Sequence, residues 1–217
     1  RTKDDFVVIL PHELRTPLSA ISGWVHILQK YGARPEHMDK ALAAIDRSVK
    51  AQTQIISDIL DVSRVNAGKL RLFQEWVDPL ALVESAVEAL QEPIRAKQLQ
   101  LQVHGNEAAK AQPAWLDPTR FQQIVWNLLT NAIKFSHAGG LVQVGLQREG
   151  TQLRLTVRDE GKGIPADFME HLFDRFAQSD APGNRLHGGL GLRLSIVRHL
   201  TDLHGGQVSA TSEGLGR

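Results

Sequence analysis

The 217-residue sequence contains no cysteine, which excludes disulfide bonds and metal sites built on thiolates. It has no apolar run close to the roughly 20 residues that a helix needs to span a bilayer, and no signal peptide. An excess of charge of one sign is also missing: the formal net charge is +1, so neither nucleic acid nor an anionic membrane is indicated as a partner. We therefore expect a cytoplasmic chain that contacts no nucleic acid and no membrane within these residues.

The apolar and charged fractions, 42% and 23%, are ordinary for a soluble globular protein, and the length allows one or two domains. The chain opens in the middle of a helical pattern and ends abruptly at Gly216-Arg217. We expect it to be a piece of a longer protein, in which any sensor or membrane-spanning domain lies outside these residues.

A helix is predicted from near the start of the chain to about Lys30. Its apolar residues recur at spacings of three and four, at Val7, Leu10, Leu14, Leu18, Ile21 and Leu28. At roughly 100° per residue, His12 falls about 120° to 180° from this stripe, so it points away from the buried side. Thr16 lies one turn further on, beside His12.

A histidine on a helix is usually a surface residue or a satisfied core residue. Here an acid, Glu13, follows His12 directly, and Pro17 removes a backbone donor and can bend the helix one turn later. Neutral imidazole is a competent nucleophile near pH 7, and a neighbouring carboxylate can hold the proton of the other ring nitrogen and fix the tautomer. We therefore predict that His12 accepts a phosphoryl group.

A second amphipathic helix follows a turn at Tyr31–Pro35 and ends near Gly68, a plausible cap. Its apolar positions are Met38, Leu42, Ile45, Val49, Ile56 and Ile59, with Gln52 in a slot where an apolar residue is expected. Two helices joined by a short loop form an antiparallel hairpin, which cannot cover both of its apolar stripes alone. We predict a homodimer whose two hairpins form a four-helix bundle; an ordinary interaction coiled coil is the alternative.

A domain boundary is predicted near residue 70, because helical and strand periods mix beyond it. Strands are expected at 71–76, 99–103, 141–147 and 153–158, with a last one starting near Gln207, and helices at about 79–95, 118–135 and 190–203. The helix expected at 190–203 is stopped by His204-Gly205-Gly206. The predicted fold class is α+β: the helical hairpin, then an α/β sandwich with a mixed sheet and helices on one face.

A polar stripe marks the helix expected at 118–135, which starts after an N-cap signal at Asp117-Pro118. Asn127, Asn131 and Lys134 fall on one face, opposite Phe121, Val125, Leu129 and Ala132. The stripe could simply be solvated. Amide oxygens are, however, suitable ligands for a hard cation, and a lysine pairs with phosphate, so the stripe suits magnesium triphosphate.

A carboxylate and two glycines follow the strand expected at 153–158. Strict alternation places Asp159 on the buried face with Leu153, Leu155 and Val157, where it needs a partner such as the exocyclic amine of adenine. Gly161 and Gly163 allow the backbone to turn and to approach the base closely. Further on, the polar stretch 177–187 predicts a mobile lid, and glycines ahead of a helix offer backbone amides to phosphate.

His-Glu-Leu-Arg-Thr-Pro-Leu, residues 12–18, closely resembles the phosphoacceptor motif of the sensor histidine kinases of two-component systems, and the remaining motifs match that family in order. They are its asparagine box (121–135), first glycine box (159–163), phenylalanine box (172–176) and second glycine box (188–197). The resemblance covers essentially the whole chain. It implies a dimerisation and phosphotransfer domain at 1–70 and an ATP-binding domain at 71–217 that lacks the family's last strand.

The resemblance also implies ATP and Mg2+ as cofactors and a response-regulator receiver domain as partner. It makes His12 the nucleophile, Glu13 its base or orienting partner, and Thr16 the residue that orients a water in a phosphatase reaction. Asn131 would ligate magnesium with Asn127 in support, and Lys134 would meet the phosphates. The other implied nucleotide contacts are Phe135, Asp159, Gly161, Gly163, Phe173, Phe176, Arg185, Gly189 and Gly191.

Three positions depart from the family. Pro11 stands where many members carry serine. Gln178 stands where many carry an arginine, and Arg185 would take over the role of that arginine. Arg193 stands where members usually show a third glycine. Its guanidinium either points outward or adds a phosphate contact, or its bulk impairs nucleotide binding and leaves a dimeric scaffold that docks signalling partners. A gyrase-type or chaperone-type ATPase would not explain the helix that carries His12.

Overall fold

The computed structural model describes residues 2–32, 34–174, 177 and 191–215. The chain forms two compact units. Residues up to Leu70 belong to one unit, with described residues between 174 and 192, and residues 71–173 and 193–215 belong to the other.

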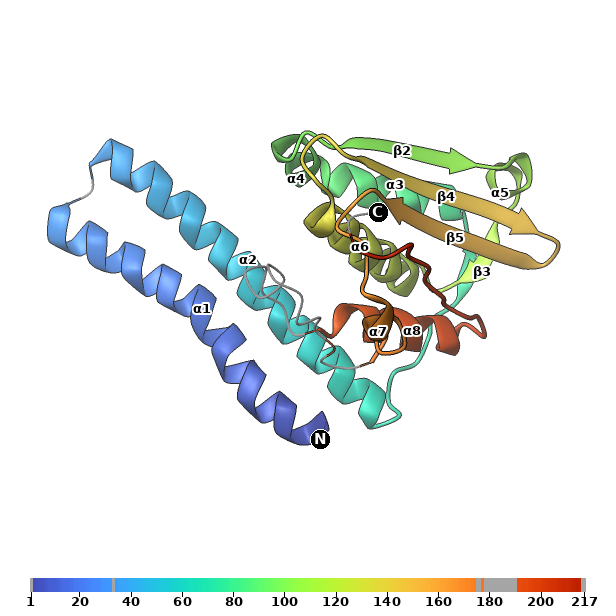
Figure 1. The fold of residues 1–217 in the computed structure, drawn as a ribbon, viewed down its shortest axis with the longest axis horizontal. Coiled ribbons are helices and arrows are strands. Elements are labelled where there is room, and N and C mark those ends of the chain that lie inside the picture. The colour runs from blue at the N-terminus through green and yellow to red at the C-terminus, as the bar shows by residue number, and fades with distance from the viewer. Residues whose placement is uncertain (1, 33, 175–176, 178–190, 216–217) are drawn as a thin grey trace. The chain divides into compact units, whose positions relative to one another are not determined.

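The first unit contains two long helices that run side by side, α1 (Thr2–Tyr31) and α2 (Pro35–Asn66) (Figure 1). Pro35 opens α2, where a missing N–H has no cost. Gly68 has a φ of +61° and ends α2, with Gly68 N donating to Val65 O and Lys69 N donating to Arg64 O at 3.0 and 2.9 Å. The predicted hairpin and its glycine cap are confirmed.

The apolar stripe of α2 is divided between two faces. Ala41 and Ala44 are buried, and Met38, Ile45 and Ile59 are partly buried. Leu42, Val49 and Ile56, spaced by seven residues, remain 57%, 48% and 47% exposed. Leu18 and Val25 of α1 are exposed at the same spacing. The hairpin therefore carries a second apolar face besides the one between its helices.

The second unit is built on a mixed sheet of β2 (Gln100–Gly105), β4 (Leu141–Glu149) and β5 (Gln152–Asp159), in that order. β2 and β4 are parallel, and β4 and β5 are antiparallel. β1 (Glu75–Val77) and β3 (Ala114–Leu116) form a separate antiparallel pair. The helices are α3 (Pro79–Ala89), α4 (Gln91–Ala96), α5 (Glu107–Ala111), α6 (Pro118–Phe135), α7 (Ala166–Met169) and α8 (Arg193–Leu203).

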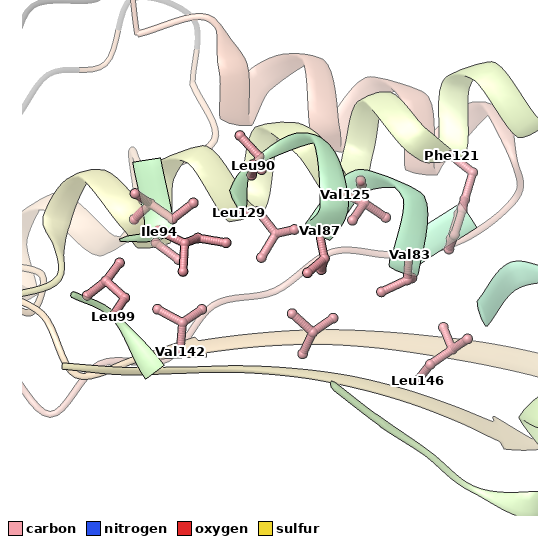
Figure 2. Close-up of a cluster of buried hydrophobic side chains, with 14 of the residues drawn as sticks. Val83, Val87, Leu90, Ile94, Leu99, Phe121, Val125, Leu129, Val142 and Leu146 are labelled. Carbon is pink, nitrogen blue, oxygen red and sulfur yellow. The ribbon is translucent and has the colours of Figure 1, made fainter. Parts of the chain in front are cut away.

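The core lies between α3, α4 and α6 and one face of the sheet (Figure 2). Val83, Val125 and Leu129 from the helices meet Val142 and Leu146 of β4, and all five are fully buried. The other face of β2 carries exposed polar side chains, at Gln100, Gln102 and His104. This confirms the predicted α+β class, with a mixed sheet and helices on one face.

The α6 and α8 helices match the prediction closely, whereas other elements differ. The helix expected at 79–95 breaks at Leu90, because Pro93 has no N–H to continue the ladder. β1 is shorter and later than the strand expected at 71–76. No strand forms in described residues 206–215, so the strand expected near Gln207 is wrong; Ile164 N binds Ser212 Oγ there, at 2.9 Å, in place of a backbone ladder.

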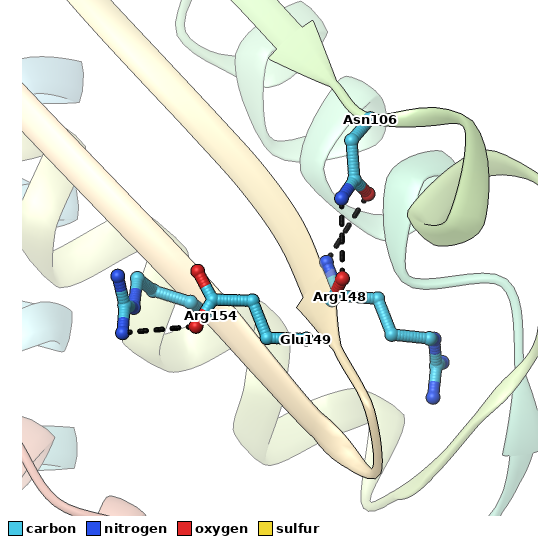
Figure 3. Close-up of polar contacts among 4 residues, drawn as sticks. All are labelled: Asn106, Arg148, Glu149 and Arg154. Atoms are coloured by element: carbon cyan, nitrogen blue, oxygen red, sulfur yellow. Dashed lines mark hydrogen bonds and ion pairs between the residues drawn. The ribbon is translucent and has the colours of Figure 1, made fainter.

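Three short elements, β3, α5 and α7, were not predicted. Asn106 caps α5 by accepting from Ala109 N at 2.9 Å, and its amide also bonds both backbone groups of Arg148 at 3.1 Å, as Figure 3 shows. The same figure shows the ion pair of Arg154 with Glu149, at 3.2 Å across the β4–β5 turn. An asparagine followed by Glu107 is a helix-start signal that could have revealed α5.

The turn after β5 packs directly on the end of α6. Gly161 pairs with Ser136, and Lys162 N donates to Phe135 O at 3.3 Å. A Cβ on Gly161 would lie 2.6 Å from both Phe135 O and Asp159 Oδ1. Glycine is therefore required here by close backbone approach.

We predict that Gly161→Ala destabilises the second unit by about 1 to 3 kcal/mol, because backbone must move to admit the methyl group. Denaturant unfolding measures the loss. Gly145→Ala is the matched control: its Cβ would meet only Thr156 Cβ, at 3.6 Å, and it should unfold near the parent's midpoint. Equal losses in the two variants would contradict the role of Gly161.

A second prediction concerns Gln98, whose φ of +54° is the only positive value outside glycine in the described residues. It ends α4, with Leu99 N donating to Ile94 O at 3.0 Å, in a position that favours glycine. Gln98→Gly should raise the free energy of unfolding by about 1 kcal/mol. Gln100→Gly, in extended β2, should lower it by about 0.5 to 1 kcal/mol. Destabilisation by Gln98→Gly would refute the strain.

Candidate functional site

The start of α6 is fixed by Asp117, as its N-cap signal predicted. Asp117 Oδ1 accepts from Arg120 N at 3.0 Å, and Oδ2 accepts from Phe73 N at 2.8 Å. Asp117 N donates to His204 Nε2 at 3.1 Å, so the other ring nitrogen, Nδ1, carries the proton that bonds Leu200 O at 2.7 Å. His204 thereby joins the end of α8 to the start of α6.

The other end of α6 is held by Lys97. Its Nζ donates to Ile133 O at 2.6 Å and to Lys134 O at 2.7 Å, and a cation is favourable beside the last carbonyls of a helix. Burial lowers the pKa of Lys97, and the nearby Lys162 ammonium lowers it further. Sequence reasoning missed Lys97 altogether and used His204 only as part of a helix stop, because no local motif shows that either side chain reaches α6.

The polar stripe on α6 is not simply solvated. Asn127 is completely buried. Its Nδ2 donates to Arg193 O at 3.3 Å, while its Oδ1 is buried without a hydrogen-bond partner among the described residues. A buried acceptor without a partner is costly and calls for an explanation. For Asn127, the alternative of a solvated face is wrong.

Asn131 and Lys134 continue the stripe and are partly buried. Lys134 Nζ lies 4.9 Å from the centre of the Phe135 ring. Among the described residues, no three histidine, aspartate or glutamate side chains gather into a metal site. Amide oxygens are suitable ligands for a divalent cation and a lysine pairs with phosphate, so these residues fit magnesium triphosphate.

Asp159 corrects one expectation. Leu153, Leu155 and Val157 turn to the core as predicted, but Asp159 is exposed, because β5 ends there, beyond the hydrophobic layer. Partial burial of its carboxyl still raises its pKa, and a hydrogen bond from the Gly161 backbone lowers it in part. Gly163, in the same turn, has a φ of +69°.

The structure describes only some of the other residues that are predicted to contact the nucleotide. Phe173 is partly buried in the turn after α7, and Gly191, with a φ of +64°, lies just before α8. Phe176 and Gly189 lie outside the described residues. So does the predicted lid, including Arg185, apart from Ala177.

Arg193 is the first residue of α8 and turns towards α6. Its Nη1 donates to Thr130 Oγ1 at 3.3 Å. The expectation that the Arg193 guanidinium points outward is therefore wrong.

The residues of the predicted phosphoacceptor motif belong to α1 in the first unit. His12 lies within this helix. Glu13 is partly buried, and Thr16, three residues further on the same side of the helix, is exposed. Pro11 and Pro17 both lie inside α1, and Pro17 is buried.

Comparison with protein families gives two matches. Residues 2–68 match the His Kinase A (phospho-acceptor) domain, and residues 116–217 match the histidine kinase-, DNA gyrase B- and HSP90-like ATPase family. No helix of the described residues is long and apolar enough to cross a membrane.

Among curated proteins, the hybrid signal transduction histidine kinase D of Dictyostelium discoideum is 32% identical over 99% of this chain and 17% of its own length. The circadian input-output histidine kinase CikA of Synechococcus elongatus is 34% identical over 97% of this chain and 28% of its own length. The chain thus spans less than a third of either relative.

Among solved structures, the histidine kinase AdeS of Acinetobacter baumannii shares the fold, with a TM-score of 0.72 at 24% identity over 94% of this chain and 92% of AdeS. Full-length ShkA in complex with AMPPNP has a TM-score of 0.69 at 26% identity, over 96% of this chain and 42% of the ShkA chain. ThkA in complex with the response regulator TrrA has a TM-score of 0.65 at 23% identity, over 92% of this chain and 55% of the ThkA chain. With the two family matches in the predicted order, the chain belongs to the sensor histidine kinases, as a core of phosphoacceptor hairpin and ATPase-like domain.

Proposed function

We propose that this chain transfers the γ-phosphoryl group of ATP to His12 and passes it to an aspartate on a response-regulator receiver domain. The observation that carries the proposal is the order of the two matched regions: a phosphoacceptor hairpin with a histidine in α1, followed by an ATPase-like domain. The buried, unpartnered Oδ1 of Asn127 supports ligand binding at α6.

In the first step, an imidazole nitrogen of His12 forms a bond to the γ-phosphorus while the bond from that phosphorus to the β–γ bridging oxygen breaks, and ADP leaves. Glu13 takes the proton from the other ring nitrogen or holds it in place. Mg2+, when bound, neutralises negative charge on the phosphates. Asn131 and Asn127 offer it amide oxygens, and Lys134 pairs with phosphate.

The remaining predicted contacts bind the nucleotide. Asp159 accepts from the adenine amine, and Phe135 packs on the base. Gly161 and Gly163 shape the turn below it. Phe173, Phe176, Arg185, Gly189 and Gly191 complete the site, as the resemblance implies.

The partner proposed for the second step is a receiver domain. The support is the ThkA structure, whose title names a complex with a response regulator. Thr16, exposed and close to Glu13 on α1, orients a water for a separate reaction, the hydrolysis of the partner's phosphoaspartate. We propose that these reactions take place in the cytoplasm.

Dimerisation is proposed from the exposed apolar row of α2. Leu42, Val49 and Ile56 repeat at seven residues, the spacing of a helical bundle seam, and Leu60 extends the row. A second copy of the hairpin covers this apolar row with its own exposed apolar row.

The labelling prediction uses γ-labelled ATP with Mg2+. The parent should acquire label that is acid-labile and alkali-stable, and His12→Ala should lose essentially all of it, because the acceptor nitrogen is gone. His26→Ala is the matched control, since His26 is an exposed histidine of the same helix, and it should label like the parent.

Equal labelling of His12→Ala and the parent would refute His12 as acceptor. A folded, dimeric parent that takes no label would favour the scaffold alternative, for which the specific observation is Arg193 at the start of α8.

The dimer prediction uses Val49→Glu. A charge in the middle of the exposed apolar row should weaken association by about a hundredfold, because the carboxylate would be buried unpaired. Light scattering at micromolar concentration should give a dimer mass for the parent and a monomer mass for the variant. Ala43→Glu, exposed about 100° away from Leu42 around the helix, should remain dimeric. A monomeric parent would exclude the dimer.

A further inference from the structure

Arg193 connects α8 to α6 at two points. Its carbonyl accepts from Asn127 Nδ2, and its Nη1 donates to Thr130 Oγ1, both at 3.3 Å. The Thr130 hydroxyl donates in turn to Trp126 O at 2.8 Å. The guanidinium is thereby held beside the polar stripe of α6, next to the residue that precedes Asn131.

This contact uses little of what the side chain offers. A guanidinium is always charged and has five N–H donors in a planar fork. In the described part of the chain one of these donors is used, on a neutral hydroxyl, and the ion pairs found there do not include Arg193. Nor does α8 need it for packing, because Ile196, Val197 and Leu200 bury that helix.

Two further observations point to a ligand at this junction that brings both a phosphate and a cation or donor: the start of α8 suits the phosphate, and the acceptor oxygen of Asn127 suits the cation or donor. α8 is eleven residues long, and Arg193 stands at its start, where backbone amides and the helix dipole favour negative charge. Asn127, which reaches Arg193 O through Nδ2, is completely buried and leaves Oδ1 without a partner in the described residues.

On the basis of the proposed function, we infer that Arg193 is a further nucleotide-binding residue, whose guanidinium leaves Thr130 to contact the β- and γ-phosphates of ATP. The hydrogen bond to Thr130 joins a charged donor to a neutral acceptor at 3.3 Å, so exchanging it for a charge-assisted, two-pronged contact with phosphate is favourable. Together with Lys134, Arg193 then places a cation on each side of Asn131.

The test is calorimetric titration of the 217-residue chain with ATP, ADP and AMP in the presence of Mg2+. Arg193→Met should weaken ATP binding about tenfold, ADP binding less, and AMP binding not at all, because AMP has neither phosphate. Arg193→Lys should recover part of the loss. Arg198→Met removes the same charge from an exposed position of α8, and all three affinities should stay at the parent's values.

If the hydrogen bond between Arg193 and Thr130 only links α8 to α6, the variants should behave differently. Arg193→Met and Thr130→Val would then lower the unfolding temperature alike and leave the ratio of ATP to AMP affinity unchanged, and this result would overturn the inference. In our inference Thr130→Val keeps the parent's ratio while Arg193→Met lowers it. Should Arg193→Met not fold, Arg193→Gln is titrated with the same expectation.

The same data separate this inference from the proposed function. A parent that binds ATP, with an Arg193→Met variant that binds it equally well, overturns the role of Arg193 alone. A folded parent that gives no magnesium-dependent heat with any nucleotide overturns both.

Discussion

The second unit depends on how firmly α6 is held at its two ends. The Asp117 carboxylate accepts from Arg120 N and Phe73 N, and the Asp117 backbone N–H donates to His204, so three separate segments meet at one residue. At the far end, Lys97 takes up two carbonyls. A helix anchored in this way presents Asn127, Asn131 and Lys134 at fixed positions, and fixed position is most of what phosphoryl transfer requires from a protein.

Two side chains, one on α6 and one at the end of β5, cost stability. Asn127 Oδ1 is buried without a partner in the described residues, and the pKa of Asp159 is raised by burial. A carboxyl with a raised pKa binds its proton more tightly in the folded state, so its contribution to stability falls as the pH rises above its ordinary value of 3.8. At neutral pH the buried acceptor of Asn127 is unfavourable for the apo fold, whereas solvent around the exposed Asp159 limits the cost of its charge. Such groups persist where a ligand uses them.

The sequence predicted those parts that are encoded locally. The boundaries of α6 follow from Asp117-Pro118 at its start, and the end of α8 from His204-Gly205-Gly206. The strands β4 and β5 follow from the alternation of apolar and polar residues along them. Long-range partners escaped prediction: nothing near Lys97 in the sequence shows that it reaches Ile133 O, and the exposure of Asp159 depends on where the hydrophobic layer ends. Burial of Asn127 has the same origin, because α8 supplies the contact from 66 residues away.

Arg193 shows how one substitution can change a site without changing its fold. Its backbone serves α8 as any residue would, and its carbonyl meets Asn127 whatever the side chain is. The guanidinium stands where the family usually shows glycine, and it lies against Thr130, beside the stripe that suits magnesium triphosphate. The structure accommodates the side chain with α6 and α8 packed together. What the arginine adds is charge, and charge near a bound triphosphate acts directly on the affinity and on the reaction.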